Sequence, residues 1–221
     1  MDFDEFRSTY VCSENWQFCQ QWMHIHVQWN FMTRKYTLNR RAEQLAETRR
    51  RIVEAAVDLH TSVGPALTSL SMIAERAGVQ RHTLYAHFPD ERSLFLACSG
   101  LAMERDPLPN AEPWRAIGDR RERLRTGLRA IYAWFERNAA HAACVLRDAE
   151  HHVLTKEVAE MRFGPYLAAY QQVLGDGLSA RQRPVMRLAL SFYTWRTLVR
   201  DGGLETGDAV EAMVRAVDCA Q

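Results

Sequence analysis

The sequence contains few cysteines, almost no lysine and no long apolar run. Its five cysteines are scattered along 221 residues without a Cys-x-x-Cys pair, which argues against a disulfide framework and favours a reducing compartment. No apolar stretch approaches the ~18–20 residues that a membrane span requires, and the acidic first residues are unlike a secretory signal. We therefore expect a cytoplasmic protein without a membrane partner.

The balance of charges excludes strongly basic classes of protein. The sequence has 28 basic and 27 acidic residues, so a histone-like or polybasic tail protein is excluded. Lys35 and Lys156 are the only lysines, and nearly all positive charge is therefore carried by guanidinium groups. Helical spacing of apolar residues recurs along the chain, and no alternation of apolar and polar residues is long enough for a strand. These patterns predict an all-α protein.

Residues 1–31 differ in composition from the rest of the chain. They contain Trp16, Trp22 and Trp29 but only one basic residue against four acidic ones, and they show no clean helical or strand periodicity. The composition changes at Met32, which is a plausible start. Residues 1–31 are therefore either an upstream extension that is not part of the native protein or a genuine accessory segment, and the sequence leaves both open.

Residues 32–104 are predicted to form a first domain. We expect a basic arm before its first helix, where the positive side chains could enter a minor groove or neutralise phosphates. The arm comprises Arg34, Lys35, Arg40 and Arg41. The apolar face of the first helix comprises Leu45, Ile52, Val53, Ala55, Ala56 and Leu59. Gly64-Pro65 should end this helix, and the Asp-Pro-Leu-Pro run at 106–109 marks the domain boundary.

The segment from 69 to 88 has the pattern of two short helices that meet at a steep angle. Ala74 is small enough for close contact between the helices, and Gly78 tolerates a positive φ in the turn. Ile73, Val79 and Leu84 are spaced to close the hinge. This arrangement is typical of a helix-turn-helix, whose second helix enters the major groove of DNA.

The same stretch resembles a known family. Thr68-Ser-Leu-Ser-Met-Ile-Ala-Glu-Arg-Ala-Gly-Val79, followed by Thr83-Leu-Tyr-x-His-Phe-Pro-Asp-Glu91, is similar to the TetR-type (tetracycline repressor) transcriptional regulators. The resemblance implies an all-α homodimer with an N-terminal three-helix DNA-binding domain and a C-terminal domain, residues 105–221, that binds a small effector and dimerises. The partners it implies are double-stranded DNA, a second copy of the chain and a small-molecule effector.

Some side chains of the motif are expected to contact DNA bases and others to contact phosphates. The resemblance implies that Ser69 and Ser71 open the first helix of the motif against DNA. Arg81 can bind guanine and Gln80 adenine through paired hydrogen bonds, although glutamine is a poor helix cap. The full set expected at DNA is Ser69, Ser71, Gln80, Arg81, His82, Thr83, Tyr85, His87, Arg40 and Arg41, of which Thr83, Tyr85 and His87 suit phosphates.

The C-terminal domain is predicted to hold an apolar cavity. Phe163, Tyr166 and Trp195 are the aromatic residues best placed to line it, and Gly164-Pro165 is expected to interrupt a helix beside them. The last two helices, about 180–200 and 207–219, should pair with their symmetry mates in a four-helix dimer interface. Their apolar faces comprise Val185, Leu188, Phe192, Trp195 and Val199, and Val210, Met213, Val214 and Val217.

No catalytic constellation, metal site or cofactor motif is predicted. The cluster of Asp148, Glu150, His151 and His152 and the set Cys12, Cys19, His24 and His26 both lack the usual spacing of zinc ligands. The sequence thus favours a ligand-responsive regulator, most simply a repressor that binds a palindromic operator as a homodimer and is released by its effector. An activator, a redox-responsive regulator acting through Cys98 or Cys144, and an all-α enzyme or small-molecule carrier stay open as alternatives.

Overall fold

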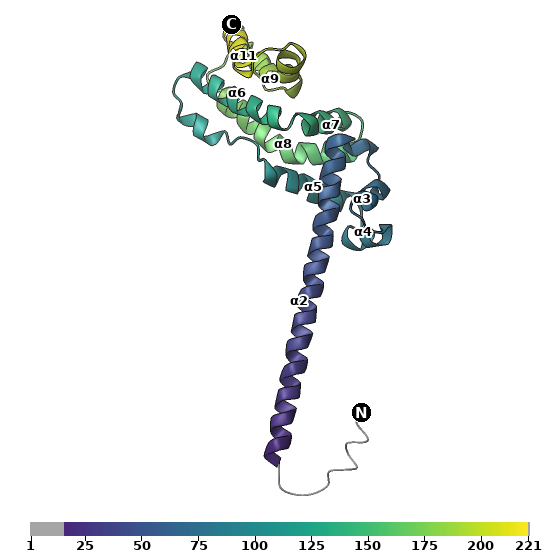
Figure 1. Ribbon diagram of the computed structural model, residues 1–221. Coiled ribbons are helices and arrows are strands. Elements are labelled where there is room, and N and C mark those ends of the chain that lie inside the picture. The colour runs from purple at the N-terminus through teal and green to yellow at the C-terminus, as the bar shows by residue number, and fades with distance from the viewer. Residues whose placement is uncertain (1–15, 221) are drawn as a thin grey trace. The chain divides into compact units, whose positions relative to one another are not determined.

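The computed structural model describes the backbone of residues 16–220 and the side chains of residues 39–220, and every element in that range is helical (Figure 1). Cys12, Cys19, His24 and His26 therefore lie outside the described side chains. The chain divides into two units, one ending at Arg49 and the other beginning at Arg50. No helix in the described range is long and apolar enough to cross a membrane.

Helix α2, Trp16–Ser62, passes from the first unit into the second. Because it begins at Trp16, the helix has no break at Met32, and the prediction that residues 34–41 form an arm before the first helix is wrong. These residues are part of the helix itself. The segment that follows them, residues 42–47, consists of alanine, glutamate, glutamine and leucine, which have high helix propensity. Leu45 is 56% exposed and does not join the predicted apolar face, whereas Ile52 and Ala56 are fully buried.

The remaining elements all belong to the second unit. They are η1 (Pro65–Leu67), α3 (Leu70–Arg76), α4 (Arg81–His87), α5 (Glu91–Arg105), η2 (Glu112–Ala116), α6 (Arg120–Arg137), α7 (Ala139–Ala149), α8 (Val153–Leu174), α9 (Gln182–Ala189), α10 (Phe192–Trp195), the π-helix η3 (Arg196–Asp201) and α11 (Thr206–Cys219). In Figure 1, α6 lies next to α11 and α5 next to α8, in agreement with their contacts.

Local sequence signals explain most helix boundaries. The α2 helix ends at Ser62, immediately before Val63 and the predicted Gly64-Pro65 stop, and Gly64 has a φ of 108°. Ser69 caps α3 by accepting a hydrogen bond from Met72 N at 3.2 Å. Asp90 caps α5 in the same way, accepting from Ser93 N at 2.6 Å. These caps satisfy amide groups that have no partner inside the helix.

Two helix predictions in the C-terminal region are wrong. Gly164-Pro165 does not interrupt a helix, since α8 continues through Pro165 and its packing against α5, α6 and α7 offsets the hydrogen bond that the proline removes. The segment 180–200 is not one helix. It breaks at Leu190, and Ser191 starts α10 by accepting a hydrogen bond from Tyr193 N at 3.2 Å.

Two groups of buried apolar residues hold the second unit together. One extends from Ile52 to Cys98 and joins the end of α2 to α3, α4 and α5. The other extends from Ala111 to Val217 and joins α6, α8, α9, α10 and α11. Val210, Val214 and Val217 are fully buried in this second core, as is Trp195. The faces predicted to form a dimer interface are thus largely covered within the single chain, because α11 packs on α6.

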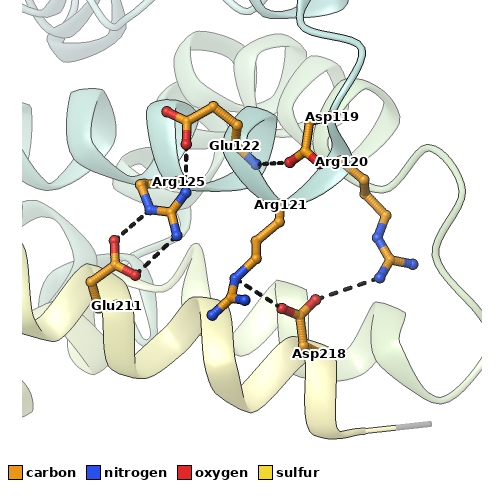
Figure 2. Close-up of polar contacts among 7 residues, drawn as sticks. All are labelled: Asp119, Arg120, Arg121, Glu122, Arg125, Glu211 and Asp218. Carbon is orange, nitrogen blue, oxygen red and sulfur yellow. Dashed lines mark hydrogen bonds and ion pairs between the residues drawn. The ribbon is translucent and has the colours of Figure 1, made fainter.

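Ion pairs join α11 to the first half of α6 (Figure 2). Arg120 and Arg121 both pair with Asp218, at 3.5 and 3.3 Å, and Arg125 makes two contacts to Glu211 at 2.5 and 3.1 Å. Basic residues at a helix start and an acidic residue near a helix end each oppose the helix dipole. Pairing them across the two helices compensates both, and so supports the packing of α11 inward.

Candidate nucleic-acid interface and internal cavities

Helices α3 and α4 form a compact pair around a tight turn. Ile73, Ala74 and Leu84 are buried between them, as the spacing predicts. Gly78 has a φ of 64°, in the left-handed region that favours glycine, and Val79 N donates to Ala74 O at 2.9 Å. The turn therefore has the tight, glycine-containing geometry that joins the two helices of a helix-turn-helix.

An arginine of α2 provides a support for this turn that the sequence pattern did not indicate. The guanidinium of Arg51 donates hydrogen bonds to the carbonyl groups of Ala77 and Gly78, the latter at 3.1 Å. A cation at the end of α3 also suits the helix dipole. Its partners lie 26 and 27 residues away, so no local spacing rule connects them.

The outer surface of α4 carries the side chains expected to meet DNA. Gln80, Arg81, His82 and Tyr85 are exposed, and Gln80 makes no side-chain cap, as expected. Arg81 Nη2 donates to Tyr85 Oη at 3.3 Å, and the guanidinium lies 5.9 Å from the centre of the Tyr85 ring. The residue expected to read bases and the one expected to bind phosphate are thus in contact, one turn apart.

The other residues expected at DNA lie as follows. Thr83 and His87 are half-buried at the sides of α4. Ser69 and Ser71 are exposed at the start of α3, where the Ser69 hydroxyl is already engaged in the cap. Arg40 and Arg41 are exposed on the part of α2 that belongs to the first unit.

Helix α7 is joined to the loop that precedes α3. Asp148 is 1% exposed, pairs with Arg147 at 2.7 Å and accepts a hydrogen bond from Ala66 N at 2.9 Å. Arg147 also donates to Val63 O at 3.1 Å. Burial raises the pKa of Asp148, but the hydrogen bonds from Arg147 and Ala66 lower it by more, so its pKa lies below the usual value and the carboxylate stays charged. Added side-chain bulk at Gly64 would collide with both Arg147 and Asp148.

A second pair of contacts joins α7 to the end of α2. Thr61 Oγ1 and His141 Nδ1 are 3.1 Å apart, and Cys144 Sγ donates to Thr61 O at 3.4 Å. Together with the contacts of Asp148 and Arg147, they connect α7 to both sides of the turn between α2 and α3. We call these contacts the α7 clamp. They offer a physical route by which a displacement of α7 reaches the helix-turn-helix.

A cavity of about 240 Å³ lies beside the α7 clamp, and we call it the junction cavity. Its wall includes Val57, His60 and Thr61 of α2, and residues of α5, α6, α7 and α8. His60 is 3% exposed, and burial together with nearby His141 lowers its pKa to about 4, so the ring is neutral at pH 7. The cavity thus lies between the helix-turn-helix core and the C-terminal helices.

A second cavity, of about 370 Å³, lies among α6, α8 and α10. Phe163 lines both cavities. Tyr166 is half-buried against the C-terminal core and Trp195 is fully buried in it, and neither lines one of these two cavities. Of the three predicted effector residues, only Phe163 lies in the wall of these two cavities. Side-chain spacing could not distinguish a wall position from a core position.

The two cysteines considered for redox sensing differ in environment. Cys98 is buried, and burial raises the pKa of its thiol to about 12. A thiol that stays protonated at neutral pH is a poor nucleophile towards peroxides. Cys144 is half-buried and donates its proton to the Thr61 carbonyl. Neither cysteine is exposed, unlike the accessible thiols typical of redox sensors.

Comparison with known proteins identifies the motif. Residues 52–98 match the family described as bacterial regulatory proteins, tetR family. An uncharacterised HTH-type transcriptional regulator of Mycobacterium tuberculosis is 29% identical over 178 residues, which cover 76% of this chain and 86% of the relative. The HTH-type transcriptional activator FasR of Mycolicibacterium smegmatis is 29% identical over 103 residues, 46% of this chain and 47% of FasR.

Solved structures share the fold. A TetR-family transcriptional regulator from Mesorhizobium loti superposes with a TM-score of 0.55 over 78% of this chain and 96% of its own, at 19% identity. The relatives are described as regulators of transcription. The match of residues 52–98 to the tetR-family model, the regulator relatives and the all-α architecture together support a helix-turn-helix transcriptional regulator of the TetR family.

Proposed function

We propose that this chain is a ligand-responsive repressor, located in the cytoplasm, that binds a palindromic operator as a homodimer and is released by a small-molecule effector. The observation that carries the proposal is the position of the junction cavity. Its wall combines residues of α2 and α5, which pack with the recognition helix, and residues of α6, α7 and α8. A ligand there contacts both the DNA-binding region and the C-terminal helices.

At the operator, α4 is the recognition helix. Gln80, Arg81 and His82 face bases, and Thr83, Tyr85 and His87 bind phosphates. The exposure of Arg81 and Tyr85 and their mutual contact support this assignment, because a phosphate-bound Tyr85 would help to orient the Arg81 guanidinium. Ser69 and Ser71 would approach the backbone from the start of α3, and Arg40 and Arg41 would add phosphate contacts.

The release mechanism uses the α7 clamp. Thr61 and His141 belong both to the clamp and to the wall of the junction cavity. An effector that moves α7 therefore changes the support of the turn between α2 and α3, and with it the position of α4. The effector must bind the released conformation more tightly than the DNA-bound one, since equal affinity would shift nothing.

The homodimer would place its two recognition helices ~34 Å apart, one turn of DNA. It needs the part of the expected faces that stays exposed, since most residues of those faces are buried. Leu188 on α9 is the member of those faces that remains largely exposed, at 55%. We propose that the dimer forms around α9. An equilibrium sedimentation measurement, repeated with Leu188→Glu, tests this surface, and a dimer unaffected by that change contradicts it.

Fluorescence anisotropy with DNA from either side of the gene tests DNA recognition. The full chain should bind one fragment tightly in excess nonspecific competitor, with a steep salt dependence.

Arg81→Ala should weaken operator binding by ~1–3 kcal/mol and relax the preference at one base pair. Tyr85→Phe should weaken binding to all sequences. Arg115→Ala, an exposed arginine outside α4, serves as the charge-matched control. Equal losses on operator and random DNA for Arg81→Ala contradict its role in reading bases.

The direction of regulation has a second candidate, because the relative FasR is described as an activator. A promoter–reporter fusion separates the two. A repressor lowers expression when the chain is supplied and restores it when effector is added, whereas an activator raises expression when the chain is supplied.

A further inference from the structure

The wall of the junction cavity holds one arginine, Arg162, that has no carboxylate partner among the described side chains. The charged residues of this wall are Arg105, Asp106, Arg137 and Arg162. Asp106 pairs with Arg137 at 2.9 Å, and Arg105 pairs with Glu54 at 3.1 Å. Among residues 39–220, whose side chains the structure describes, Arg162 pairs with no carboxylate. The cavity therefore has an excess positive charge.

Arg162 is held in place by neutral groups. From α8, its Nε donates to Ser99 Oγ at 3.1 Å and its Nη2 donates to Leu96 O at 2.9 Å, both on α5. These bonds orient the half-buried guanidinium without compensating its charge, and they use only part of its five N–H donors. Neither His60 nor His141 provides a competing charge in the cavity, since burial lowers the pKa of both rings.

Most of the remaining wall is apolar. Val57, Phe95, Met103, Trp134, Val158 and Phe163 supply much of it. A cavity of about 150 Å³ accommodates benzene with its six carbons, and by proportion the 240 Å³ of the junction cavity accommodates about ten non-hydrogen atoms. An apolar wall with one uncompensated cation suits a ligand that has an apolar body and one anionic end.

We propose that the junction cavity binds an amphipathic carboxylate of about ten non-hydrogen atoms, with its carboxylate on the Arg162 guanidinium and its apolar body against Phe95 and Phe163. The inference deepens the proposed function, on which it rests, by giving the effector a chemical class. A carboxylate adds the missing negative charge and charge-assisted hydrogen bonds. A neutral ligand leaves the half-buried guanidinium uncompensated, and a cationic ligand is repelled by it.

A series of three probes of equal chain length tests the charge preference in the wild-type chain. Isothermal titration without DNA measures the affinities of octanoate, octan-1-ol and octylammonium. We expect octanoate to bind about tenfold or more tightly than octan-1-ol, and octylammonium to bind more weakly than both. Equal affinities for octanoate and octan-1-ol, or no binding of octanoate, overturn the proposal.

Two matched arginine variants locate the preference. Arg162 and Arg92 both join α5 to α8, Arg92 through Glu157, but only Arg162 lines the cavity. Arg162→Gln should bring the octanoate-to-octanol affinity ratio close to one, and Arg162→Lys should keep part of the preference because it keeps the charge. Arg92→Gln should leave the ratio unchanged. A ratio unchanged in Arg162→Gln, or lost equally in Arg92→Gln, overturns the assignment to Arg162.

The ligand inference and the proposed function can fail separately. Titration reports binding whether or not DNA is released, and a parallel anisotropy measurement reports release from the operator. Charge-selective octanoate binding that leaves operator affinity unchanged supports the ligand class and contradicts the release mechanism. Release by other small molecules, without octanoate binding, supports the proposed function and overturns the ligand class.

Discussion

Two junctions hold the helix-turn-helix, and they differ in the sequence separation of their partners. The α3–α4 pair is built largely from neighbouring residues: Ser69 caps the start of α3 by accepting a hydrogen bond from Met72 N, and Gly78 supplies the positive φ of the turn, to which Arg51 of α2 adds a more distant support. The α7 clamp joins residues that lie about eighty positions apart, since Asp148 bonds Ala66 N across 82 positions. Local junctions form as soon as their helices form, whereas the clamp exists only when the C-terminal helices are packed. The first is suited to a fixed DNA-reading shape and the second to control by a ligand.

The largest effect on stability should come from breaking the clamp. Asp148→Ala leaves the Ala66 amide and the Arg147 guanidinium without their buried partner, and we expect it to lower the free energy of unfolding by about 3 kcal/mol. Urea unfolding followed by circular dichroism measures this. Asp218→Ala, which removes a more exposed carboxylate from α11, is the control and should cost less than about 1 kcal/mol. Equal costs would mean that the clamp contributes no more than a surface ion pair.

The clamp region should also make stability depend on pH. His60 has a pKa near 4 when folded and about 6.5 when unfolded, so between these values the unfolded chain binds a proton that the folded chain excludes. The contribution of His60 to the free energy of unfolding is therefore fully present above about pH 6.5 and is lost as the pH falls. We expect the free energy of unfolding to decrease by about 2 kcal/mol between pH 7.5 and pH 5. His141, whose pKa burial also lowers, acts in the same direction. The pKa of Asp148 is lowered, so protonation of this carboxylate decreases the free energy of unfolding only at a lower pH than the protonation of His60.

Unfolding measured at several pH values tests this dependence. His60→Leu should flatten the curve over that range, because it removes the group whose pKa differs between the folded and unfolded chain. The α3–α4 turn has no histidine in its caps, so a slope that persists fully in His60→Leu would place the titrating group elsewhere.

The smallest effect should come from the local junction. Ser69→Ala removes the hydrogen bond to Met72 N, and we expect it to lower the free energy of unfolding by about 1 kcal/mol. Ser69→Asp keeps a capping acceptor and should restore most of the loss. If Ser69→Ala costs as much as Asp148→Ala in thermal unfolding, the contrast between the local and the distant junction does not hold.

Much of the DNA-binding region could be predicted because its signals are local. A cap, a glycine with positive φ and an i, i+4 apolar pair act within a few residues, so the sequence alone determined the α3–α4 pair, the end of α2 and the outward position of Arg81 and Tyr85. The family resemblance rests on these same residues. The start of α2 was missed because residues 1–31 lack a clear period, although the helix begins at Trp16 and continues through Met32.

The C-terminal region required the tertiary structure. Helical spacing placed Val210, Val214 and Val217 on one face but could not say whether α6 or a second copy of the chain covers that face. Likewise, it could not show that Asp106 neutralises Arg137 while Arg162 receives only neutral acceptors. Which arginine keeps an uncompensated charge depends on partners that lie tens of residues away. The sequence by itself determined the DNA-reading motif, and only packing between distant helices decided the clamp, the cavity and its charge.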